Sequence, residues 1–291
     1  MRLRSHLPLL ISALAALIVL GTPATGRTMD LELKGKTALI TGSTAGIGYA
    51  TARMLLREGA NVIVNGRTQA SVDRAVRALA TATGRAPEGF AGDMSKAADI
   101  ARLTRTFPRV DILINNVSRF IPGGFLATSD SDWYATFDLN VMSGVRLSRF
   151  YLPGMKQRNW GRIIFISSES ALQIPAESVE YGMSKAAEIA VARGIAEGLA
   201  QTGITVNSIL PGPTRDPDDP RTAELVKRLG ARAVAEREAS FFKTLRPTSL
   251  LKRFERTDEV AALIVFVASP LSSGTTGAAL RVDGGVVRDA F

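Results

Sequence analysis

The sequence predicts a doubly wound α/β fold, in which a single parallel sheet of about seven strands carries helices on both faces. Three observations support this prediction. Short apolar runs alternate with stretches of helical length along most of the 291 residues. The runs are rich in Ile, Val and Leu, as strands buried on both faces should be. A glycine-rich turn joins the first run to a helical stretch. Together these features indicate a Rossmann fold.

The expected strands are the seven short apolar runs of the chain. In order, they are Thr37–Thr41, Asn61–Asn65, Gly89–Ala91, Ile112–Asn115, Arg162–Ser167, Thr205–Leu210 and Ala279–Val282. The expected helices are the amphipathic stretches between these runs. They are Gly48–Glu58, Gln69–Thr83, Lys96–Phe107, Asp130–Gln157, Val179–Thr202 and Asp258–Ala268.

No repeat or linker divides residues 29–291, so we expect a single domain there. The one irregular stretch begins at Pro211, with several Pro and Asp residues, and a charged helical region continues to about Arg256. We expect residues 211–256 to form a lid over the carboxyl edge of the sheet, where ligands bind in such folds. Within it, Phe241 and Phe242 either cover an apolar substrate or anchor the lid.

Residues 1–28 differ from the rest of the chain. Arg2 and Arg4 precede an apolar run from Leu7 to Leu20, and small residues follow, which is the layout of a signal peptide. Alternatively, the start is assigned too far upstream, because a domain begins naturally at Met29. We favour a start at Met29, which makes the protein cytoplasmic. Export or anchoring through residues 1–28 is the alternative, and only then do we expect contact with a membrane.

The composition narrows the chemistry. The chain has no Cys and a single His, His6, so a thiolate site, a Ser-His-Asp triad and a His-based metal site are excluded from the folded body. We therefore expect no metal, and acid–base chemistry from Tyr, Lys, Asp or Glu. The net charge is +9. The Arg residues are scattered over most of the helical stretches rather than gathered in a stripe, so we expect no nucleic-acid partner.

The first expected strand ends in a turn with three glycines, Gly42, Gly46 and Gly48, in the sequence T-G-S-T-A-G-I-G at 41–48. Glycine permits a tight turn and lets backbone N–H groups approach a pyrophosphate at a helix N-terminus. No Gly-Lys-Ser/Thr follows, so the turn is not a Walker A loop. The strand before it and the helix after it predict a dinucleotide cofactor; the alternative is a glycine-rich turn without a ligand.

The end of the second strand bears on which dinucleotide binds. NAD sites usually place Asp or Glu there to bond the ribose 2′-hydroxyl. No acidic residue lies between Asn61 and Ala70, and Arg67 can instead pair with a 2′-phosphate. We therefore expect NADP as the cofactor, with NAD as the alternative. The plain alternative for Arg67 is that it is an ordinary solvated surface residue.

One Tyr–Lys pair has the spacing of a catalytic pair. Of the four Tyr residues, only Tyr181 has a Lys four residues on, Lys185, so that both lie on one face of a helix. A nearby ammonium favours the phenolate form of a phenol, which is otherwise a poor base at neutral pH. The preceding strand leads straight into Ser168, whose hydroxyl can hold a carbonyl oxygen. Capping of a turn is the plain alternative for Ser168.

With the glycine turn, Ser168 and the Tyr181–Lys185 pair, the sequence resembles the short-chain dehydrogenase/reductase family from about Leu31 to Val287. Within that family it is similar to the 3-oxoacyl-(acyl-carrier-protein) reductases. The further matches, in the family's order, are Gly92-Asp93-Met94, Asn115-Asn116-Val117-Ser118, Asn140, Asn207, Pro211-Gly212-Pro213-Thr214 and Val282-Asp283-Gly284-Gly285. The family's usual motif after the fourth strand is Asn-Asn-Ala-Gly. Val117 and Ser118 therefore add bulk beside the cofactor.

The resemblance implies a catalytic tetrad. Tyr181 is the general acid in reduction and the base in oxidation, Lys185 favours its phenolate and bonds the nicotinamide ribose, and Ser168 orients the substrate oxygen. Asn140 positions Lys185 through a water molecule. Asp93 lies by the adenine, and Asn115 supports the central strand. The implied cofactor contacts are Gly42, Ser43, Thr44, Gly46, Ile47, Gly48, Arg67, Asp93, Met94, Asn115, Tyr181, Lys185, Pro211, Gly212 and Thr214.

The implied function is hydride transfer between a nicotinamide cofactor and a carbonyl or secondary alcohol, with NADPH-dependent reduction favoured. A catalytically silent NADP-binding regulator is the alternative. We expect a small-molecule carbonyl or alcohol as the substrate. By resemblance we also expect a homotetramer, paired through the helices Asp130–Gln157 and Val179–Thr202. The basic lid fits either an acidic substrate or a solvated helical face.

Overall fold

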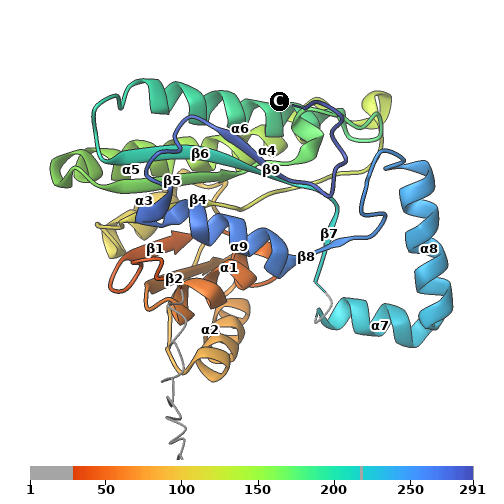
Figure 1. Ribbon diagram of the computed structural model, residues 1–291, viewed down its shortest axis with the longest axis horizontal. Coiled ribbons are helices and arrows are strands. Elements are labelled where there is room, and N and C mark those ends of the chain that lie inside the picture. The colour runs from red at the N-terminus through yellow and green to blue at the C-terminus, as the bar shows by residue number, and fades with distance from the viewer. Residues whose placement is uncertain (1–28, 217–218, 291) are drawn as a thin grey trace, which may run out of the picture. The chain divides into compact units, whose positions relative to one another are not determined.

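Seven parallel strands form one sheet, as the sequence predicts (Figure 1). The computed structural model describes residues 29–216 and 219–290, so the expectations for residues 1–28 lie outside the described residues. Residues 31–291 form one compact unit. The strand order is β3-β2-β1-β4-β5-β6-β9. The bounds are β1 Thr37–Ile40, β2 Asn61–Gly66, β3 Glu88–Ala91, β4 Ile112–Asn115, β5 Gly161–Ile166, β6 Ile204–Pro211 and β9 Ala279–Val282.

Helices cover both faces of the sheet. Their bounds are α1 Gly46–Arg57, α2 Gln69–Thr83, α3 Ala97–Thr106, α4 Asp130–Phe137, α5 Ser143–Arg158, α6 Val179–Glu197 and α9 Thr257–Ala268. Successive residues of β1 point to opposite faces, which explains why the strands are apolar throughout. Ala38 and Ile40 pack with α1, α2 and α9, whereas Leu39 packs with α3, α5 and α6.

Strand order reverses between β1 and β4. The chain leaves β1 for β2 and β3 on one side, then returns to β4 on the other. The loops at the carboxyl ends of β1 and β4 therefore diverge and leave a crevice, which is where ligands bind in open α/β sheets. The glycine turn, residues 41–48, lies at this point.

Two expected helices differ in the structure. The stretch expected as Asp130–Gln157 contains a π-helical turn, η2 Asp138–Met142, between α4 and α5. The stretch expected to end at Thr202 ends at Glu197, because the chain turns at Gly198, whose N–H bonds the Ile195 carbonyl oxygen. Among the described residues, no helix has both the length and the apolar character needed to cross a membrane.

The segment between β6 and α9 forms a helical hairpin on a small sheet, at the right of Figure 1. It comprises β7 Thr214–Arg215, α7 Pro220–Leu229, α8 Ala231–Thr244 and β8 Glu255–Arg256, and β7 pairs with β8. The Phe241, Phe242 and Phe254 rings pack together with centroids 5.0–5.2 Å apart. The aromatic residues of α8 therefore anchor the base of this hairpin.

Candidate active site

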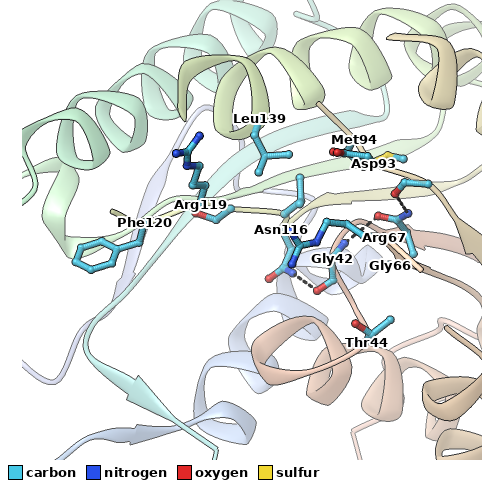
Figure 2. Close-up of a pocket in the computed structure, with 14 residues that line it drawn as sticks. Gly42, Thr44, Gly66, Arg67, Asp93, Met94, Asn116, Arg119, Phe120 and Leu139 are labelled. Atoms are coloured by element: carbon cyan, nitrogen blue, oxygen red, sulfur yellow. Dashed lines mark hydrogen bonds between the residues drawn. The ribbon is translucent and has the colours of Figure 1, made fainter. Parts of the chain in front are cut away.

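A cavity of about 580 Å³ lies at the carboxyl edge of the sheet (Figure 2). Its walls come from the end of β2, from the segments that follow β1, β2, β3 and β4, and from Leu139 of η2. Asp93 and Met94 lie toward one end, Arg119 and Phe120 toward the other, and Arg67 lies between them. The lining residues are Gly42, Thr44, Asn65, Gly66, Arg67, Gly92, Asp93, Met94, Asn116, Val117, Ser118, Arg119, Phe120 and Leu139.

The glycine turn needs its three glycines for two different reasons. Gly42 and Gly46 have φ values of +62° and +60°, which favour glycine. At Gly48, a Cβ would lie 2.6 Å from Asn116 Nδ2. Asn116 occupies that space because its Nδ2 donates hydrogen bonds to the Thr41 and Gly42 carbonyl oxygens, at 2.9 and 3.0 Å. These two hydrogen bonds hold the glycine turn against the segment after β4.

Helix α1 begins in this turn without a side-chain cap. Ala45 occupies the N-cap position and offers no acceptor to the first N–H groups. Such unpaired donors, together with the helix dipole, make a helix N-terminus a binding site for phosphate groups. The turn therefore fits the pyrophosphate of a dinucleotide.

β2 ends near Asn65, an amide, in the region where NAD sites usually carry an Asp or Glu. Asn65 Oδ1 accepts a hydrogen bond from Gly42 N at 3.1 Å, and its Nδ2 donates to Phe90 O and Gly92 O. Its polar atoms are therefore used within the protein. Arg67 is exposed on the rim of the cavity, and within the described chain its guanidinium has no hydrogen-bond or ion-pair partner. A free positive charge thus faces the cavity.

The other expected cofactor contacts fall into three places. Thr44, Asp93 and Met94 line the cavity with Gly42 and Arg67. A second hollow of about 400 Å³ beside the lid is lined by Gly46, Ile47 and Thr214, among others. The remaining residues line neither hollow: Ser43 and Gly48 are buried in the turn, and Pro211 and Gly212 lie at the end of β6.

Asn115 and Asn116, which follow each other at the end of β4, make different contacts. Asn115 is buried, but its side-chain amide has no hydrogen-bond partner within the described chain. It lies against α5, since a Cβ on Gly144 would be 3.2 Å from its Cγ. Asn116 instead makes the hydrogen bonds that hold the glycine turn.

Lys185 is anchored at the end of β5. Its side chain is 1% exposed, and its Nζ donates to the Ile166 carbonyl oxygen at 2.8 Å. Ser167 Oγ in turn donates to the Lys185 carbonyl oxygen at 2.7 Å. Lys185 Nζ lies 5.6 Å from the centroid of the Tyr181 ring. The expected pair therefore stands beside the strand end that carries Ser168.

Ser168 caps a short turn and keeps a donor free. Its Oγ accepts a hydrogen bond from Ser170 N at 3.1 Å, at the start of the 3-10 helix η3, Glu169–Ala171. This geometry agrees with the capping alternative, but it uses only a lone pair of the oxygen. The hydroxyl hydrogen has no acceptor among the described residues and can be donated to a ligand. Gly182, beside Tyr181, lies so close to this turn that a Cβ would be 3.0 Å from Ser170 O.

Asn140 connects the loop after β4 to α6. Its Oδ1 accepts from Arg119 N at 2.7 Å, and its Nδ2 donates to Arg119 O at 3.0 Å and to Ser184 Oγ at 2.9 Å. Ser184 Oγ donates to the Tyr181 carbonyl oxygen at 2.8 Å. Asn140 lies in η2, so the π-helical turn coincides with this contact. Phe120, from the same loop, meets the Tyr181 ring edge-on at 5.4 Å.

Comparisons with known proteins agree with this geometry. A model of the family described as Enoyl-(Acyl carrier protein) reductase matches residues 42–287. The chain is 41% identical over 266 residues to "Uncharacterized oxidoreductase YvaG" of Bacillus subtilis, a match that covers 90% of this chain and 100% of the relative. It is 31% identical over 271 residues to "Dehydrogenase/reductase SDR family member 4" of Homo sapiens, covering 90% and 91% of the two chains.

The chain belongs to the short-chain dehydrogenase/reductase family. It is also 35% identical over 260 residues to D-beta-hydroxybutyrate dehydrogenase of Cupriavidus necator, covering 88% of this chain and 99% of that one. Among solved structures, L-sorbose reductase from Gluconobacter frateurii, complexed with NADPH and L-sorbose, superposes with a TM-score of 0.80 at 31% identity. That match covers 90% of this chain and 100% of the other.

This short-chain dehydrogenase/reductase has two buried carboxylates beside the expected tetrad that its sequence did not predict. Glu169 follows Ser168 directly and is buried, and its Oε1 accepts from Arg246 Nε at 2.8 Å. Burial raises the pKa of Glu169, and the Arg246 guanidinium opposes that rise. Glu188 is buried against Lys185. The sequence held no signal for either carboxylate, because an acidic residue on a helix or in a turn is usually solvated.

Proposed function

We propose that this oxidoreductase is an NADP-dependent carbonyl reductase and alcohol dehydrogenase, with NADPH-dependent reduction as the favoured direction. The observation that carries the proposal is the network around Tyr181. Lys185 is buried beside the Tyr181 ring, Ser168 keeps a free hydroxyl hydrogen on the adjoining strand end, and Asn140 ties both α6 and the loop of Phe120 together.

Four features support NADP as the cofactor. The glycine turn and the uncapped start of α1 fit a pyrophosphate, and the cavity extends from there past Asp93 and Met94. The end of β2 offers an amide, already used within the protein, instead of a carboxylate for a 2′-hydroxyl. The unpaired Arg67 guanidinium suits a 2′-phosphate. The structurally similar L-sorbose reductase was solved with NADPH.

The protein's own groups then handle the proton and the charge on the substrate oxygen. The bound cofactor supplies or accepts the hydride. In reduction, Tyr181 donates its hydroxyl proton to the carbonyl oxygen as negative charge develops there. Ser168 donates a hydrogen bond to the same oxygen. The Lys185 ammonium stabilises the phenolate that remains, and Asn140 keeps the surrounding backbone in place. In oxidation, Tyr181 takes the proton from the alcohol.

The substrate we propose is a small carbonyl compound or the corresponding secondary alcohol. Two relatives are named for such substrates: D-beta-hydroxybutyrate dehydrogenase for a hydroxy acid, and L-sorbose reductase for a keto sugar. The homotetramer, the cytoplasmic location and the single domain that starts at residue 29 stay predictions.

The test is NADPH oxidation by the purified protein with a panel of ketones that includes acetoacetate, 3-oxoacyl esters and ketoses. We expect turnover of at least one class, faster with NADPH than with NADH. If the protein binds NADPH but turns over none of the panel in either direction, the regulatory alternative gains support and the proposed reaction fails.

A further inference from the structure

A second carboxylate stands behind the Tyr181–Lys185 pair. Glu188 lies one helical turn after Lys185 on α6, and its Oε1 and Oε2 are 3.0 and 3.1 Å from Lys185 Nζ. Neither side chain is accessible: Lys185 is 1% exposed and Glu188 is 2% exposed. The catalytic lysine is therefore held in a buried ion pair before any ligand arrives.

The donors of Lys185 can be accounted for one by one. An ammonium has three N–H groups. One bond goes to the Ile166 carbonyl oxygen at 2.8 Å, and two go to the Oε1 and Oε2 atoms of Glu188 at 3.0 and 3.1 Å. Glu188 and Ile166 thus fix the position of the ammonium beside the Tyr181 ring.

Burial makes this pairing decisive for the charge of Lys185. A buried ammonium without a counter-ion gives up its proton far more readily than one in water. A neutral amine at this position would no longer stabilise the phenolate of Tyr181. We propose that Glu188 is a positioning residue of the reaction, which holds Lys185 in its charged form beside Tyr181. This inference rests on the proposed function.

Within the described chain, Glu188 is the only charged side chain paired with Lys185. Glu180, also on α6, is buried, and its carboxylate makes no hydrogen bond to any described residue. Burial raises the pKa of Glu188 above its ordinary value, and among the described residues Lys185 is the group that opposes this rise. β6, packed against α6, carries no charged side chain. On the other elements that pack against α6, the ionisable side chains are paired elsewhere or exposed. They are Asp132 with Arg119, Asp138 with Arg146, Glu169 with Arg246, Arg162 with backbone carbonyls, and the exposed Asp130 and Tyr134.

The direct test is the titration of Lys185 in the full chain, followed by NMR of isotope-labelled lysine side chains and assigned with Lys185→Arg. We expect Lys185 in Glu188→Gln to lose its proton at least about one pH unit below wild type. Glu188→Asp keeps the negative charge, so its Lys185 should lose the proton at a pH between those of wild type and Glu188→Gln. Glu197→Gln is the matched control, because Glu197 pairs with Arg193 on the same helix but both are more than half exposed; it should leave Lys185 unchanged.

Kinetics supply the second readout. In Glu188→Gln, the alkaline limb of the pH profile of kcat should move to lower pH by the same amount, with the KM for the carbonyl substrate nearly unchanged. A mere packing role would lower stability without moving this limb. The inference is overturned if Glu188→Gln keeps the wild-type titration and pH profile, or if Glu188→Asp shows no recovery over Glu188→Gln. If wild type shows no turnover, the proposed function fails, and the NMR titration still decides the role of Glu188.

Discussion

Arg246 reaches from the end of the α7–α8 hairpin to Glu169, the residue that follows Ser168. Its Nε donates to Glu169 Oε1 at 2.8 Å, and its Nη1 lies 3.5 Å from an oxygen of Glu177. The side chains of Glu169 and Arg246 are only 3% and 13% exposed. This ion pair thus connects the α7–α8 hairpin to the turn that begins at Ser168.

Removal of the Arg246 guanidinium should therefore cost both stability and substrate affinity. In Arg246→Ala, the buried Glu169 carboxylate loses its only ion-pair partner among the described residues, which should lower the free energy of unfolding by about 3 kcal/mol. The loosened lid should raise the KM for the carbonyl substrate. Chemical denaturation and steady-state kinetics measure the two effects.

Arg232→Ala is the matched control for this prediction. Arg232 also pairs with a glutamate, Glu236, but the side chains are 93% and 64% exposed, so the pair should contribute less than about 1 kcal/mol. Equal losses of stability in the two variants would show that the buried Arg246–Glu169 pair stabilises the fold no more than an exposed ion pair does. A double variant with Glu169→Gln should lose less than the sum of its parts.

Glu255 should make the stability of the protein depend on pH near neutrality. It is buried in β8, its Oε2 accepts from Gly212 N at 3.2 Å, and its Oε1 has no partner within the described chain. Burial, chiefly, raises its pKa from the ordinary 4.5 to about 7, and Asp283 adds to the rise. The folded state thus binds this proton more tightly than the unfolded chain does. The resulting stabilisation is complete below pH 4.5 and is lost as the pH rises through about 7.

Glu255→Gln keeps an acceptor for Gly212 N but cannot ionise. We expect its melting temperature to fall less than that of wild type between about pH 5 and pH 8. At about pH 8 its free energy of unfolding should exceed that of wild type by about 1 kcal/mol. Thermal melts of both proteins across this range make the comparison. Parallel curves would remove Glu255 as a source of the pH dependence.

Arg67 should decide the choice between the two cofactors. Arg67→Asp removes the charge that suits a 2′-phosphate and provides a carboxylate for a 2′-hydroxyl. We expect the ratio of kcat/KM for NADPH over NADH to fall by about a hundredfold. Arg77→Asp, an exposed arginine on α2 that does not line the cavity, is the control. An unchanged ratio in Arg67→Asp would take Arg67 out of cofactor selection.

The seven strands could be predicted from the sequence because burial on both faces imposes a plain chemical pattern. Ala38, Leu39 and Ile40 alternate between two helix layers, and each layer demands an apolar side chain. The π-helical turn at Asn140 could not be predicted in this way. It accompanies hydrogen bonds to the backbone of Arg119, which is distant in sequence and close only in the folded chain.

Part of the site could be predicted in the same way. The spacing of Tyr181 and Lys185 and the glycine turn are local patterns that the sequence displays. The choice between Asn115 and Asn116 does not: the two residues are adjacent and identical, and their directions in the fold decide which one reaches the turn. Glu188 is hidden for a similar reason, since only the packing of α6 on the sheet reveals that its carboxylate is buried.

The measurement that tests the account most directly is hydride transfer by Tyr181→Phe, with NADPH binding followed by fluorescence in the same samples. The variant keeps the ring that contacts Phe120 and loses only the hydroxyl that we propose as the proton donor. We expect a fall in kcat of about a thousandfold or more, with NADPH affinity within about twofold of wild type. Tyr134→Phe, whose ring is exposed on α4, should behave as wild type. Retention of near wild-type turnover by Tyr181→Phe would contradict the central claim.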